Sequence, residues 1–108
     1  MRKFKDLRDC IRYRMSESTE NYYYVQLWEE EVKLFCNDLD ASILFIQTAI
    51  TDEELYWLSE VFSNILLMAK SWEVLSSIRT RASSVQDQDI RQEIQNEIEE
   101  AAGAAGLF

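Results

Sequence analysis

The strongest structural signal in the sequence lies in residues 51–70, which read TDEELYWLSEVFSNILLMAK. The stretch opens with a capping box, because the Thr51 hydroxyl can accept the N–H of Glu54 while the Glu54 carboxylate reaches back to Thr51. Apolar side chains then recur every three or four residues, which is typical of an amphipathic helix. We therefore predict a helix from Asp52 to about Lys70 at the centre of the fold. Its expected inward side chains are Leu55, Leu58, Phe62, Ile65 and Ala69, with Tyr56, Trp57, Val61 and Met68 widening the stripe.

The same periodicity predicts helices on both sides of this central element. The expected ranges are about 2–15, 22–35, 39–49, 72–82 and 87–102. The second and third ranges form either two helices or one, because the apolar spacing continues through Asn37 and Asp38. Ser71 is placed to cap the helix that follows it, and Trp72 is expected to face inward. The polar residues 16–21 indicate a loop.

The composition favours an all-helical fold. The 108 residues include no proline and no histidine, and the only glycines are Gly103 and Gly106. Tight β-hairpins and phosphate-binding loops usually need glycine, and His-based triads and zinc sites need histidine. We predict an all-α, single-domain bundle of five or six helices. The domain is expected to span residues 1–102, with residues 103–108 as a flexible Ala/Gly tail.

The chain is strongly acidic, and its charge is unevenly distributed. Twenty acidic and 11 basic residues give a net charge of −9. Residues 1–16 carry six basic and two acidic groups, whereas residues 17–60 carry eleven acidic groups and only Lys33 as a base. Either the basic first helix lies near the acidic stretch of its own fold, or one of these patches contacts a partner. Direct binding to nucleic acid is not expected, and a basic protein is the better electrostatic match.

The two cysteines and the first residues indicate the compartment. Cys10 and Cys36 are too few for a disulfide scaffold and lie among apolar residues. We expect buried free thiols, with one disulfide as the alternative. The charged first residues lack the apolar segment of a signal peptide, and the longest apolar run before the tail, residues 65–69, is too short to span a membrane. We therefore expect a cytoplasmic protein without a membrane partner.

Several carboxylate pairs raise the question of catalysis. Their expected positions on exposed helix faces favour a solvated surface over acid–base chemistry. Residues 37–42 lack the glycine and the terminal Glu of a calcium loop, and neither cysteine has a histidine to activate it. We predict no catalytic residue, no cofactor and no metal, so the protein is not expected to be an enzyme. The pairs are Asp38 and Asp40, Glu53 and Glu60, and Glu93 and Glu97.

Aromatic residues beside carboxylates suggest a protein-binding surface. Residues 22–24 are three consecutive tyrosines, and at least one ring must be exposed because helix positions differ by about 100°. The Glu run at 29–31 is interpreted as a solvated face. Exposed aromatics flanked by carboxylates suit a basic protein partner, although core packing would also explain individual rings. The candidate partner-binding residues are Tyr22, Tyr23, Trp28, Glu29, Glu30, Glu31, Asp52, Glu53 and Glu60.

Two segments carry a resemblance to a known group of proteins. Residues 53–62, EELYWLSEVF, together with the upstream residues 27–31, LWEEE, resemble small acidic helical immunity proteins of bacterial polymorphic-toxin and contact-dependent growth inhibition systems. The resemblance covers about residues 24–80. It implies a cytoplasmic chain that binds a cognate toxin domain and neutralises it, by stoichiometric occlusion. The alternative is another interaction module, such as an adaptor, a secretion chaperone or an acidic inhibitor that mimics nucleic acid. A homo-oligomer is compatible with either function.

Overall fold

The computed structural model describes residues 3–16 and 24–107 and is all-α over those residues. The 3-10 turn η1 joins α4 to α5, so the two act as one bent central helix in a six-helix bundle. This architecture confirms the predicted fold class. The elements are α1 (Leu7–Ser16), α2 (Tyr24–Asn37), α3 (Leu39–Thr48), α4 (Asp52–Leu58), η1 (Ser59–Val61), α5 (Phe62–Ala69), α6 (Trp72–Ala82) and α7 (Gln88–Ala105).

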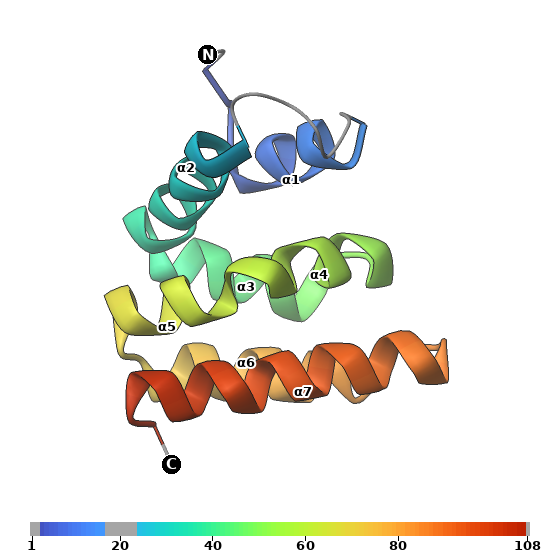
Figure 1. Ribbon diagram of the computed structural model, residues 1–108. Helices are drawn as coiled ribbons and strands as arrows, with labels where there is room; N and C mark the ends of the chain where they lie inside the picture. Colours follow the sequence, from blue (N-terminus) through green and yellow to red (C-terminus); the bar gives the residue numbers. More distant parts are fainter. Residues whose placement is uncertain (1–2, 17–23, 108) are drawn as a thin grey trace.

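The helices form three layers, with the predicted central helix in the middle one (Figure 1). Helix α1 packs on α4 and α2 packs on α5, which covers one side of the central segment. Helix α7 packs on α5 along the other side, and α6 packs on both α3 and α7. The segment from α4 to α5 therefore contacts helices from both outer layers.

The apolar stripe of the central segment forms much of the core. Side chains predicted to point inward are buried at Leu55, Leu58, Val61, Phe62 and Ile65. The predicted width of the stripe was wrong on one flank, because Tyr56 is 36% exposed and Met68 is 61% exposed. Leu66 is buried instead of Met68, since it follows Phe62 by four residues and therefore shares its helix face.

The start of the central segment has the predicted capping box. Thr51 Oγ1 accepts the N–H of Glu54 at 3.1 Å, and Glu54 Oε1 accepts the N–H of Thr51 at 2.9 Å. The sequence suggested one continuous helix, but the structure interrupts it with the 3-10 turn η1. The Ser59 hydroxyl donates to the carbonyl of Tyr56, and such a side-chain bond competes with the backbone ladder. The 3-10 turn at Ser59–Val61 lies at this point.

Removing the capping hydroxyl should weaken the fold modestly. Thr51→Ala should lower the free energy of unfolding by about 1 kcal/mol, because the Glu54 N–H loses its side-chain acceptor. Thr51→Ser is the matched control, since it keeps a hydroxyl in the same place. Urea denaturation of the two variants measures the difference, and equal stabilities would show that the cap contributes nothing.

Capping residues also define the starts of three other helices, one of which differs from its predicted range. Helix α1 starts at Leu7 instead of residue 2, because the Asp6 carboxylate accepts the N–H of Asp9 at 2.9 Å. Asp38 has extended backbone and its carboxylate accepts the N–H of Ala41, so α2 and α3 are two helices. Ser71 caps α6 as predicted.

The prediction that the last helix ends at residue 102 was wrong. Helix α7 continues to Ala105 and ends at Gly106, whose φ of 75° is left-handed. The N–H of Leu107 donates to Ala102 O and that of Gly106 to Gly103 O, which is the hydrogen-bond pattern of a Schellman motif. Leu107 is buried at this cap, so residues 103–107 belong to the folded domain.

Candidate protein-binding surface

The basic first helix pairs with acidic residues of its own fold, which confirms the first interpretation of the charge asymmetry. Glu54 is 1% exposed, and its Oε2 accepts hydrogen bonds from Arg8 Nε and Arg12 Nε, each at 3.0 Å. Arg8 also donates through Nη2 to Glu54 Oε1 at 3.1 Å. The capping carboxylate of α4 is therefore also the anion that holds α1 against the central segment.

The Glu54 carboxylate should make the fold sensitive to acid. Burial alone would raise its pKa, but hydrogen bonds from Arg8, Thr51 and Arg12 lower the pKa from 4.5 to about 2. A carboxyl with a lowered folded-state pKa stabilises the fold above pH 4.5 and loses that contribution as the pH falls toward 2. We expect Glu54→Gln to reduce the loss of stability over this range in urea denaturation. An unchanged slope would contradict the assignment.

Glu31 is not part of a solvated face, which corrects the prediction for the Glu run. It is fully buried on the same face of α2 as Leu27 and Phe35, four residues before and after it. Its carboxylate accepts Arg14 Nη1, and Arg14 Nη2 lies 2.6 Å from Glu60 Oε2. The Arg14 guanidinium also lies over the Trp57 ring, 5.6 Å from its centroid. The spacing of four between buried positions was the sequence signal for Glu31, but the acidic run obscured it.

Asp52 is likewise engaged within the fold. Arg81 Nη2 lies 2.6 Å from Asp52 Oδ1, and the N–H of Gln86 donates to Oδ2 at 3.0 Å. The backbone hydrogen bond from Gln86, followed by that from Arg81, lowers the pKa of Asp52. This carboxylate ties the start of α4 to the connection between α6 and α7 and is not a free contact residue.

The remaining predicted contact residues are scattered. Glu29 and Glu53 are exposed, Glu30 and Trp28 are half-buried, and Glu60 is exposed while bound to Arg14. Tyr22 and Tyr23 lie outside the described residues. Of the nine predicted residues, the structure brings Trp28 and Glu60 together in one groove.

This groove runs between α7 and the junction of α4 and η1, and we call it the acidic groove. It has a volume of about 550 Å³. Carboxylates of α7 form one side, and the aromatic rings of Trp28 and Tyr56 lie among its walls. Glu93 lies beside the Tyr56 hydroxyl and, through hydrogen bonding and its negative charge, raises the pKa of Tyr56. The lining residues are Trp28, Tyr56, Ser59, Glu60, Glu93, Asn96, Glu97 and Glu100.

The carboxylates of α7 distinguish this groove from the rest of the acidic surface. Glu93, Glu97 and Glu100 are exposed and spaced four and three residues apart, so they share one face of the helix. No Lys or Arg is among the described residues that line the groove. The spacing along α7 was visible in the sequence. The meeting of this face with Tyr56 and Glu60 depends on the packing of α7 on the central segment.

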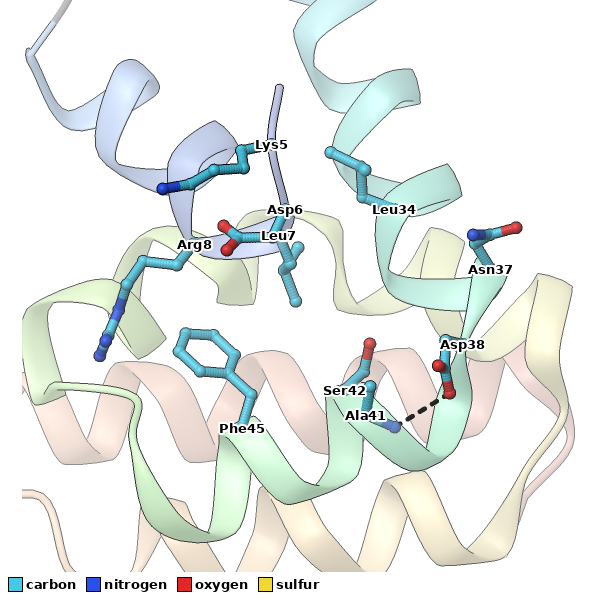
Figure 2. Close-up of a pocket in the computed structure, with 10 residues that line it drawn as sticks. All are labelled: Lys5, Asp6, Leu7, Arg8, Leu34, Asn37, Asp38, Ala41, Ser42 and Phe45. Atoms are coloured by element: carbon cyan, nitrogen blue, oxygen red, sulfur yellow. Dashed lines mark hydrogen bonds between the residues drawn. The ribbon is translucent and has the colours of Figure 1, made fainter. Parts of the chain in front are cut away.

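A second hollow lies between α1, α2 and α3 and has a volume of about 410 Å³. Figure 2 shows Leu7 and Phe45 at the space between α1 and α3, with charged residues around them. Those charges are of both signs, because Lys5 and Arg8 line the hollow together with Asp6 and Asp38. Asp38 is already bonded to the N–H of Ala41. This hollow therefore offers no single-sign field to a charged partner.

The cysteines do not provide a reactive site. Both are free; Cys10 is buried and Cys36 is half-buried. Burial, followed by the charge of Glu31, raises the pKa of Cys10 to about 12, and burial raises the pKa of Cys36. Both groups are therefore poor thiolate nucleophiles near neutral pH.

In residues 3–16 and 24–107, no three His, Cys, Asp or Glu side chains are grouped so that they could hold a metal ion. None of the helices in that same part of the chain has the length and apolar character needed to cross a bilayer.

Comparison of the chain with protein-family models, curated proteins and solved structures gives no match.

Proposed function

We propose that this chain is an immunity protein that binds a cognate bacterial toxin domain in the cytoplasm and neutralises it by stoichiometric occlusion. The single observation that supports this proposal most strongly is the acidic groove. Three exposed carboxylates of α7 lie there beside two aromatic side chains, Trp28 and Tyr56. The resemblance of residues 24–80 to immunity proteins supplies the class of partner.

In this proposal the charges of the groove and its aromatic side chains contribute to binding in different ways. The arginines of α1 are already engaged by Glu31, Glu54 and Glu60, so none of them neutralises the three α7 carboxylates that line the groove. The resulting negative field speeds association with a basic surface, and salt screens it beyond about 10 Å at 0.1 M. Buried aromatic anchors mainly slow dissociation, because they contribute through desolvated contact. In this proposal the toxin domain inserts a Lys- or Arg-bearing segment into the groove.

Co-expression tests the proposed function directly. An immunity gene is expected immediately downstream of its toxin gene, so the toxin domain is taken from the gene upstream of this one. Cells that express that domain should stop growing, and co-expression of this chain should restore growth. Purified domain and chain should then form a one-to-one complex. Growth arrest that this chain does not relieve would contradict the proposal.

Removing the charges of α7 should slow association. The triple variant Glu93→Gln, Glu97→Gln, Glu100→Gln should reduce the association rate with the toxin domain at low salt by roughly tenfold, because it removes the field that steers the basic partner. Stopped-flow or surface plasmon resonance measurements at several salt concentrations should also show a flatter salt dependence than for the wild type.

The matched control removes the same charge from other faces of the molecule. Asp40, Glu53 and Glu73 are exposed and do not line the acidic groove. Their triple variant, with Asn and Gln replacing Asp and Glu, should retain most of the wild-type association rate. If the two triple variants associate equally fast, net charge and not the groove controls the encounter.

A further inference from the structure

The Arg14 side chain connects the hydrophobic core to the acidic groove. Its Nη1 donates to Glu31, which is fully buried, and its Nη2 lies 2.6 Å from Glu60 Oε2 at the groove. The Glu60 side chain is 38% exposed. One buried cation is therefore shared by two carboxylates, one inside the core and one at the binding surface.

The surroundings of Glu31 oppose a permanent negative charge there. Helix α1 contributes Arg14 and Cys10, η1 contributes Glu60, and α4 contributes the carbonyl and ring of Trp57 that contact Arg14. Helix α5 carries no ionisable side chain, and Asp40, the ionisable residue of α3, is not among the groups that shift the pKa of Glu31. Among the described residues, neither Glu31 Oε1 nor Arg14 Nε has a hydrogen-bond partner. The hydrogen-bonding capacity of the Arg14–Glu31 pair is therefore only partly used, which makes burial of the charged form costly.

Burial and the neighbouring carboxylate both favour the neutral acid. Desolvation, opposed by Arg14 and reinforced by Glu60, raises the pKa of Glu31 from 4.5 to about 7. Cys10 stays protonated over this range, because its pKa is raised to about 12. Glu31 is therefore the group of this cluster whose pKa is shifted toward neutral pH.

We propose that Glu31 is an internal proton switch that sets the charge of the acidic groove through Arg14 and Glu60. When Glu31 is neutral, the positive charge of Arg14 is balanced by Glu60 alone, and the groove is less negative. When Glu31 loses its proton, Arg14 is shared between two carboxylates, and the groove becomes more negative. A basic partner is then held more tightly as the pH rises through neutrality. That last consequence rests on the proposed function, whereas the switch itself is a property of the isolated chain.

A titration of the full chain without any partner tests the switch. Carbon-detected NMR follows the side-chain carboxyl carbons of Glu31 and Glu60 from pH 5 to 9, a range chosen to bracket about 7. We expect Glu31 to titrate with a midpoint at about 7 and the Glu60 resonance to inflect at the same pH. A Glu31 midpoint below about 5, near the ordinary value for glutamate, would overturn the proposal. A Glu60 resonance without that inflection would overturn the link to the groove.

A variant confirms the origin of the inflection. Glu31→Gln should remove the neutral inflection of Glu60, whereas Glu29→Gln, at an exposed position on the same helix, should preserve it. Persistence of the inflection in a folded Glu31→Gln protein would contradict the assignment. The wild-type titration decides the question on its own if that variant does not fold. Because no toxin is present, a failed titration is distinct from a failure of the proposed function.

Discussion

Replacing Arg14 by methionine should destabilise the fold by about 3–5 kcal/mol at pH 8, because it leaves the Glu31 carboxylate buried without its cation. Arg14 is 3% exposed and Glu31 is fully buried, so water cannot replace the lost partner without rearrangement of α1 and α2. The cost should shrink as the pH falls. A carboxyl with a raised folded-state pKa stabilises the fold at low pH and loses that contribution as the pH rises. Urea denaturation at pH 8 and pH 5.5 measures both effects.

A double variant provides the control for this experiment. Arg14→Met combined with Glu31→Leu removes both charges together and fills the space with apolar atoms. It should recover most of the lost stability, since buried ion pairs are often replaceable by apolar residues. A loss below about 1 kcal/mol for Arg14→Met alone, at pH 8, would mean that the pair is hydrated and contributes as little as a surface ion pair.

Phe62→Ala should also destabilise the fold by about 3–5 kcal/mol, because it leaves a cavity in the core. Phe62 is 1% exposed and lies where the 3-10 turn passes into α5, at the centre of the bundle. A domain of this size has a total stability of only about 5–15 kcal/mol, so much of the variant could be unfolded. Thermal and urea denaturation give the value.

Met68→Ala is the matched control, because Met68 lies on the same helix and is 61% exposed. It should change the stability by no more than about 0.5 kcal/mol. A Phe62→Ala loss below about 1 kcal/mol, or a comparable loss for Met68→Ala, would contradict the assigned core face of α5.

Local signals in the sequence predicted the architecture well where one physical rule dominated. The capping box at Thr51 and Glu54 fixed the start of α4, and the apolar spacing from Leu55 to Ile65 identified the inward face. Both depend on neighbouring positions along one helix. The ends of α1 and α7 were missed, because Asp6 and Gly106 act through short-range caps that the periodicity of apolar residues does not include.

Two predictions about burial were wrong because they weighed the type of residue above its position in the helix. Glu31 has the spacing of a buried residue, but two adjacent glutamates suggested an exposed run. Trp72 was expected inside and is 53% exposed, because it occupies the first position of α6 beside its Ser71 cap. The later apolar positions Leu75, Ile78 and Ala82 of the same helix are buried.

The acidic groove could be predicted from the sequence only in part. The sequence drew attention to Trp28 and Glu60 and to the acidic charge around them. It could not show that α1 neutralises Glu54 while the α7 carboxylates remain beside Tyr56, because these contacts join segments far apart in the chain. Tertiary packing therefore shifts the candidate contact surface from residues 22–60 toward α7.

Hydrogen exchange of the chain, free and in complex with the toxin domain proposed as its partner, tests the central claim most directly. We predict that binding slows exchange of backbone amides around residues 56–60 and 93–100, the two segments that form most of the acidic groove. Amides around the α3–α6 contact, which contributes no residue to the groove, should exchange at unchanged rates. Slower exchange confined to α3 and α6, or to the hollow between α1 and α3, with the groove unaffected, would contradict the claim that the acidic groove is the binding surface.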